Sequence, residues 1–110
     1  MKEENIKSQM RKGVLEYCIL LLLDSKDAYA SDLIKKLKNS QMIVVEGTLY
    51  PLLTRMKNAE YLSYRWEEST QGPPRKYYSL TVKGKQFLSD LENSWNLLNQ
   101  AVNKLKNKQI

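Results

Sequence analysis

The chain has 110 residues, 42% hydrophobic and 27% charged, a composition typical of one compact globular domain. Eighteen lysines and arginines against twelve acids leave a formal charge of +6, which favours anionic partners. With no histidine and one cysteine, the sequence excludes Cys/His zinc sites, Ser-His-Asp triads and Cys-His pairs, so we expect no enzyme of these classes and no metal or other cofactor.

The location of the protein is predicted from its apolar segments. The longest of these, Tyr17 to Leu23, has seven residues, and the N-terminus mixes both charge signs without an apolar signal core. Cys18 lies inside the apolar run, where a buried thiol in a reducing compartment is the main interpretation and a redox sensor the alternative. We therefore expect a cytoplasmic protein without a membrane partner.

Two helices are predicted in the first part of the chain. The first runs from about Asn5 to Asp24 and is apolar on almost every side, so that several neighbouring elements must cover it. Ser31 is the predicted N-cap of a shorter second helix that ends at about Asn39.

A third helix follows the connector 41–45, starting between Glu46 and Thr48 and ending near Ala59. Pro51 fits only in the first turn or so, where its missing N–H has no partner within the helix. The helical period places Leu49, Leu52, Leu53 and Met56 on one side, with small, polar and basic residues opposite.

The rest of the chain predicts a hairpin and a long helix. Two aromatic-rich runs, 61–67 and 75–80, flank a turn cluster at 69–74 and have the form of a β-hairpin. Thr81 is the predicted N-cap of the last helix, and Gly84 is a weak point in its first turn.

Three helices followed by a hairpin predict a winged helix-turn-helix, mainly α with a β wing, in which the third helix enters the major groove of DNA. Arg55 and Lys57 would meet phosphates there, and Thr48, Tyr50 and Thr54 would donate hydrogen bonds to phosphates or bases. Arg75 and Lys76 follow the turn, in a stretch from 69 to 89 with four basic residues and no acid. An ordinary surface helix beside a solvated loop is the alternative.

The last helix carries an apolar heptad seam. Its members follow spacings of 3, 4, 3, 4 and 3 and are Leu88, Leu91, Trp95, Leu98, Val102 and Leu105. Either the seam folds back on its own domain, or it joins a second copy in a homodimer, the arrangement we expect. We divide the chain into a DNA-binding domain, 1–80, and a dimerisation helix, 81–110.

Trp95 lies midway along this seam. A tryptophan at such a position usually packs in the core, because its ring buries a large area. In a dimer, two facing indoles could also enclose a flat aromatic ligand between them. The spacing leaves both interpretations open.

Three segments resemble the PadR family of bacterial transcriptional regulators. They are RKGVLEYCILLLL (11–23), GTLYPLLTRMKNAEYL (47–62) and GPPRKYYSLTVKGK (72–85), which occur in the family's order. The resemblance implies a dimeric winged-helix repressor on a palindromic operator in double-stranded DNA. The family's DNA-contacting positions correspond to Thr48, Tyr50, Arg55, Arg75 and Lys76.

The short C-terminal region is similar to that of the smaller, multidrug-responsive PadR-like repressors. In those proteins a tryptophan in a matching context stacks on planar drugs, which implies a ligand contact for Trp95. They place an acid one turn later, where this chain has Asn99, so the cation preference does not carry over. The wing tip also differs, because Gly72 is followed by two prolines rather than by a basic residue.

Two other function classes are alternatives to a DNA-binding regulator. A winged domain could use its last helix to join a protein complex without reading DNA. A small enzyme would need carboxylate or tyrosine chemistry alone, and no pair of acids has a suggestive spacing.

Overall fold

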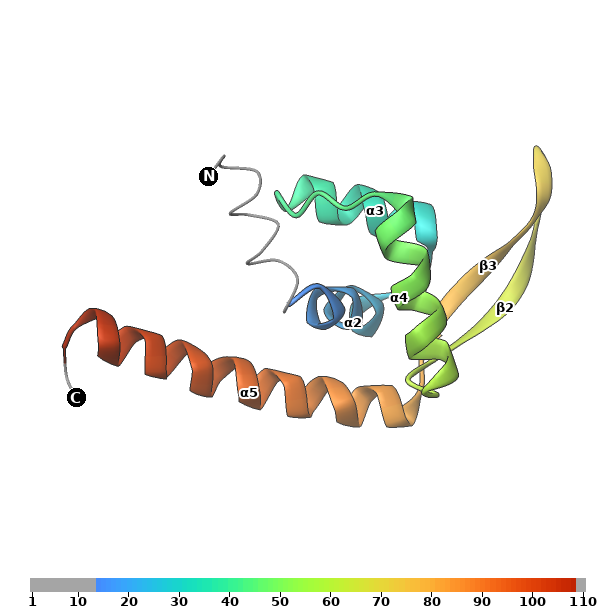
Figure 1. The fold of residues 1–110 in the computed structure, drawn as a ribbon. Coiled ribbons are helices and arrows are strands. Elements are labelled where there is room, and N and C mark those ends of the chain that lie inside the picture. Colours follow the sequence, from blue (N-terminus) through green and yellow to red (C-terminus); the bar gives the residue numbers. More distant parts are fainter. Residues whose placement is uncertain (1–13, 109–110) are drawn as a thin grey trace.

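The computed structural model describes residues 14–108, so residues 5–13 of the first predicted helix lie outside the described part. The elements are α2 (Leu15–Ser25), β1 (Ala28–Tyr29), α3 (Ala30–Asn39), α4 (Glu46–Asn58), β2 (Leu62–Ser69), β3 (Gly72–Leu80) and α5 (Val82–Lys106). Figure 1 shows α2, α3 and α4 grouped beside the hairpin, with α5 passing beneath α2 and extending beyond it. The predicted α+β winged-helix order is confirmed.

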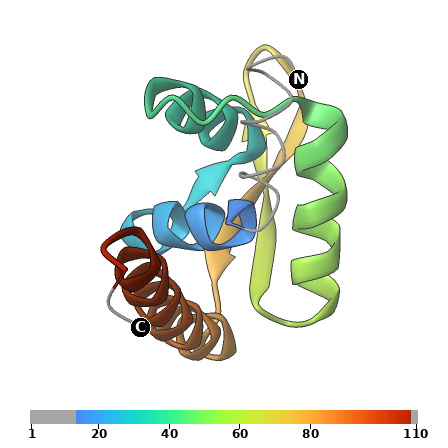
Figure 2. The same ribbon diagram turned by 60° about the vertical axis from the view of Figure 1, so that its left-hand side comes forward.

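Helix α2 lies at the centre of the molecule. Leu15, Ile19, Leu20 and Leu23 are buried, and α2 contacts α3, α5 and β3. In Figure 2, α2 crosses between α3 and α5, which explains why it is apolar on several sides. Cys18 is partly buried beside this core, and burial raises the pKa of its thiol above the ordinary value. The thiol is therefore protonated at neutral pH and a poor nucleophile.

A short strand and a different cap replace the predicted start of α3. β1 pairs antiparallel with Tyr77 and Tyr78, giving a three-stranded sheet of order β1-β3-β2. The N-cap is Tyr29, whose N–H donates to Asp32 Oδ2 at 3.1 Å, so Ser31 lies inside the first turn. The prediction of Ser31 as cap was wrong because the Asp32 carboxylate, three residues after Tyr29, accepts from the N-cap N–H.

Helix α4 has the predicted inner face, with Leu49, Leu53 and Met56 buried. Pro51 is nevertheless in the second turn of the helix rather than the first, which corrects the expectation for this residue. A proline there removes the hydrogen bond to the carbonyl four residues earlier, that of Gly47. Gly47 is exposed to solvent, and water can therefore take the place of the missing donor.

The hairpin is longer than predicted. β2 and β3 pair from Leu62↔Leu80 to Ser69↔Gly72, with a register shift between Glu67 and Ser69. Pro73 and Pro74 therefore belong to a strand rather than to the turn. They lie beyond the part of β3 that pairs with β1. There β3 has β2 on one side only, so a residue without a backbone N–H can be tolerated.

Thr81 is the N-cap of α5, as predicted: its Oγ1 accepts from Gly84 N at 2.9 Å. The Thr81 hydroxyl also donates to the carbonyl of Glu60 at 2.6 Å, which ties the start of α5 to the end of α4. The 25 residues of α5 span about 37 Å at ~1.5 Å per residue. The radius of gyration is 16.1 Å, against about 13 Å for a compact chain of this length, because α5 extends past the body.

Across residues 14–108, no helix combines the length and the apolar character that a membrane span requires.

Candidate nucleic-acid interface

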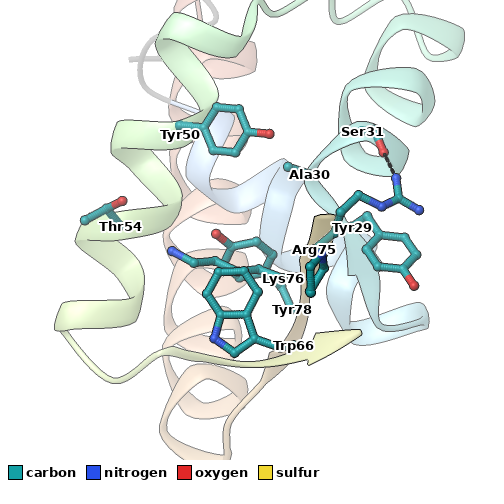
Figure 3. A pocket seen from close by; sticks show the side chains of 10 residues that line it. Tyr29, Ala30, Ser31, Tyr50, Thr54, Trp66, Arg75, Lys76 and Tyr78 are labelled. Carbon is teal, nitrogen blue, oxygen red and sulfur yellow. Dashed lines mark hydrogen bonds between the residues drawn. The ribbon is translucent and has the colours of Figure 1, made fainter. Parts of the chain in front are cut away.

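A groove of about 330 Å³ opens between α4, the start of α3 and the hairpin. Four of the predicted DNA-binding residues line it, Tyr50 and Thr54 from α4 and Arg75 and Lys76 from β3. Figure 3 shows the α4 side chains on one wall and the hairpin side chains on the other. The structure thus brings the predicted recognition helix and the predicted wing to one surface.

The other three predicted DNA-binding residues lie outside the lining of this groove. Thr48 is exposed near the start of α4, and Lys57 faces a smaller neighbouring groove of about 160 Å³, which Lys76 also lines. All of the predicted DNA-binding residues on α4 are exposed. Leu49 and Leu53, on the opposite side of the helix, are buried in the core.

Arg55 forms an ion pair that the sequence did not indicate. Its guanidinium contacts the carboxylate of Glu16 on α2, while 67% of the Arg55 side chain stays accessible to solvent. A surface pair of this kind stabilises a protein by only about 0–1 kcal/mol, so a phosphate can compete for the guanidinium. In the free protein, Glu16 therefore partly compensates the positive charge of Arg55.

Arg75 is held at the start of α3. Its guanidinium lies 4.0 Å from the ring centre of Tyr29 and donates to Ser31 Oγ at 3.4 Å. Successive residues of a strand point to opposite faces, so Arg75 and Lys76 are presented differently even though they are neighbours in the sequence. Lys76 lies over the rings of Tyr64 and Trp66, at 4.6 and 5.6 Å from their centres.

The basic residues of the hairpin differ in their partners. Arg65 donates from Nε to Glu67 Oε1 at 2.6 Å, lies 3.7 Å from Asp27 and covers the ring of Tyr77. Within residues 14–108, no carboxylate forms an ion pair with Arg75 or Lys76. On the described part of the hairpin, the positive charge available to an anion is therefore that of Arg75 and Lys76.

Sequence reasoning missed several residues of this groove, namely Tyr29, Ala30, Ser31, Trp66, Pro74 and Tyr78. Strand alternation with a known register would have placed Trp66 opposite Lys76, but the register depends on the position of the turn. Burial raises the pKa of Tyr78, and the nearby Tyr50 and Tyr64 add to the shift. Its hydroxyl is therefore a neutral donor at neutral pH.

The seam of α5 divides into two parts. Leu88 is buried and Leu91 is partly buried against the core of the same chain. Further along, Leu98, Val102 and Leu105 are exposed, and so is Leu97, which the heptad spacing did not include. About half of the seam thus covers its own domain, and the other half covers nothing within residues 14–108.

Trp95 lies at the boundary between these two parts. Its ring centre is 6.3 Å from that of Tyr17 on α2, with the planes tilted by 40°, and 39% of the residue is exposed. Asn99, one turn later, is exposed. One side of the indole is therefore packed on the domain while another side is accessible.

Comparison with known proteins gives the chain a family. Residues 19–90 match the transcriptional regulator PadR-like family. A PadR-like transcription factor from Bacteroides fragilis is 68% identical with a TM-score of 0.78, covering 92% of this chain and 98% of its own. A PadR-like transcriptional regulator from Bacillus cereus is 40% identical with a TM-score of 0.77, covering 88% and 95%.

A protein of Lysinibacillus sphaericus is 30% identical over 93 residues, which are 82% of this chain and 85% of that one. The family consists of transcriptional regulators rather than enzymes, and its winged-helix fold is that of a DNA-binding regulator. This chain belongs to the PadR-like family of transcriptional regulators.

Proposed function

We propose that the chain is a dimeric repressor that binds a palindromic operator through α4 and the hairpin. The groove that Tyr50, Thr54, Arg75 and Lys76 line together carries this proposal, because it joins a recognition helix to a basic wing. Thr48, Arg55 and Lys57 extend the same contact along the outer face of α4. A dimer seated on promoter DNA would block access of the transcription machinery.

The dimer forms through the exposed half of the α5 seam. Four large apolar side chains, Leu97, Leu98, Val102 and Leu105, are exposed on one helix, and a second copy offers the matching surface. Residues 81–110 then serve as the dimerisation helix and residues 1–80 as the DNA-binding domain. The two recognition helices must meet half-sites about 34 to 36 Å apart.

The salt dependence of binding tests the DNA-binding function. If the dimer neutralises about six to eight phosphates, log affinity falls against log salt with a slope of roughly −5 to −7. Fluorescence anisotropy with the DNA directly upstream of the chain's own gene measures this slope. A slope near zero contradicts the proposal.

Two substitutions locate the ionic contacts. Lys76→Ala and Arg75→Ala should each weaken binding to all sequences and flatten the slope by about two per dimer, one for each subunit. Arg65→Ala is the matched control on the same hairpin, because Glu67 and Asp27 already compensate its charge. Equal effects of all three variants would remove the groove from the interface.

A planar aromatic ligand at Trp95 would release the operator by favouring one arrangement of the two subunits over another. The accessible side of Trp95 and its contact with Tyr17 support such a site, and Asn99 offers an uncharged polar contact one turn away. A ligand that binds both arrangements equally would change nothing. The residues of the seam and of the ligand site therefore affect DNA affinity by setting the distance between the two recognition helices.

Trp95→Phe tests the ligand site. In this variant, most of the quenching of tryptophan fluorescence by planar aromatic dyes should be lost. Operator binding should persist, because phenylalanine retains the packing on Tyr17. Quenching that persists through Trp66 would place the dye elsewhere. The alternative function, a protein-interaction module, predicts that the purified protein does not retard the upstream fragment in a gel.

A further inference from the structure

Trp66 is a large apolar side chain on the surface of the hairpin. It is 60% exposed, although an indole gains more from burial than almost any other side chain. It lies on the face of β2 that is turned toward α4, in the groove with Tyr50 and Thr54. Its exposure therefore coincides with the surface that carries the proposed contact with DNA.

The ring of Trp66 is held in place before anything binds. Tyr64 meets it edge to face, with ring centres 5.8 Å apart and planes at 87°. Lys76 is its direct partner in the strand register, and the ammonium group lies 5.6 Å from the indole centre and 4.6 Å from that of Tyr64. Holding both side chains in the free protein lowers the entropy that binding must overcome.

An apolar ring directly beside a cation matches one part of a DNA duplex. The faces of the bases are stacked inside the helix, whereas each deoxyribose presents an apolar surface next to a phosphate. In Figure 3 the indole and the Lys76 side chain lie close together, across the groove from Tyr50 and Thr54. A strand that passes between α4 and the hairpin would place a sugar on the indole and its phosphate at Lys76.

We propose that Trp66 is a DNA-binding residue that packs against a deoxyribose of the bound strand while Lys76 pairs with the adjacent phosphate. This inference rests on the proposed function and adds to it an apolar contact with the backbone. Such a contact carries no sequence information and releases no counterions. It can thus be separated experimentally from both base recognition and ion pairing.

The first test compares Trp66→Ala and Trp66→Phe on two duplexes, the fragment upstream of the gene and a mixed-sequence duplex. Trp66→Ala should weaken binding to both by about tenfold with an unchanged salt slope. Trp66→Phe should keep most of the affinity. Wild-type affinity in Trp66→Ala, a loss confined to one duplex, or a flattened slope would each overturn the inference.

A second test reads the burial of the indole directly. In Trp66→Phe only Trp95 emits, so subtracting its signal from that of the wild type isolates Trp66. DNA should protect Trp66 from acrylamide quenching, and unchanged quenching in the bound state would overturn the inference even if Trp66→Ala fails to fold. If the wild type binds neither duplex, the proposed function itself fails. If the wild type binds and Trp66 stays accessible, only the inference fails.

Discussion

Replacing Leu98 with aspartate is expected to dissociate the proposed dimer into monomers. Leu98 is 58% exposed in the chain alone and is the first residue of the exposed half of the seam. The two-fold axis would bring two aspartates into one apolar interface. Each carboxylate would then lose its water without gaining a partner, which costs several kcal/mol. Light scattering after gel filtration measures the change in mass.

The same variant should lose operator affinity by more than about a hundredfold, because a monomer holds only one half-site. Gln100→Asp is the matched control, since it adds the same charge two residues later on the opposite face of α5. If Leu98→Asp remains a dimer, the seam is not the interface. A monomer that binds the operator as tightly as the wild type would contradict the need for two half-sites.

Replacing Gly84 with alanine is expected to lower the free energy of unfolding by about 3 kcal/mol. A Cβ atom at this position would collide with the backbone carbonyl of Tyr61 and would lie 2.8 Å from Leu80 Cδ1. The segment at Tyr61 and the start of α5 cannot move apart easily, because the Thr81 hydroxyl donates to the carbonyl of Glu60 at 2.6 Å. The gain in helix propensity, about 1 kcal/mol, is smaller than the cost of this overlap.

Urea unfolding at a fixed protein concentration measures the effect, since dimerisation would make the midpoint depend on concentration. Gly47→Ala is the control, because a Cβ atom at Gly47 would have nothing within 4 Å. It should leave stability unchanged or raise it slightly. Equal stabilities of the two variants would show that α5 can shift away from Tyr61 without cost.

The sequence predicted most of the secondary structure because helices and strands leave local periodic patterns. The buried face of α4 follows from a period of 3.6, and Thr81 was recognisable as a cap from its place before the last helix. Errors occurred where the signal was short or competed with another. β1 has only two residues, too few to show an alternating pattern. At the start of α3, Ser31 was the predicted cap, but the N-cap is Tyr29, whose N–H donates to Asp32 Oδ2.

For the candidate site, the sequence indicated residue types but not the partners of each side chain. Arg55, Arg75 and Lys76 were identified as candidates because basic residues on a recognition helix and wing attract phosphates. Their partners could not be predicted, because Glu16, Ser31 and Trp66 are brought to them by the packing of separate elements. Arg75 and Ser31, for example, are 44 residues apart.

Sequence alone thus determined the helices, the hairpin, the inner face of α4 and the heptad seam, since each depends on residues within a few turns of one another. Only the tertiary structure decided which cations are compensated, which half of the seam is covered and why position 84 is glycine. Gly84 shows the reason most clearly. A glycine weakens the helix locally. It is required at this position because the folded chain brings the carbonyl of Tyr61, from the segment before β2, against it.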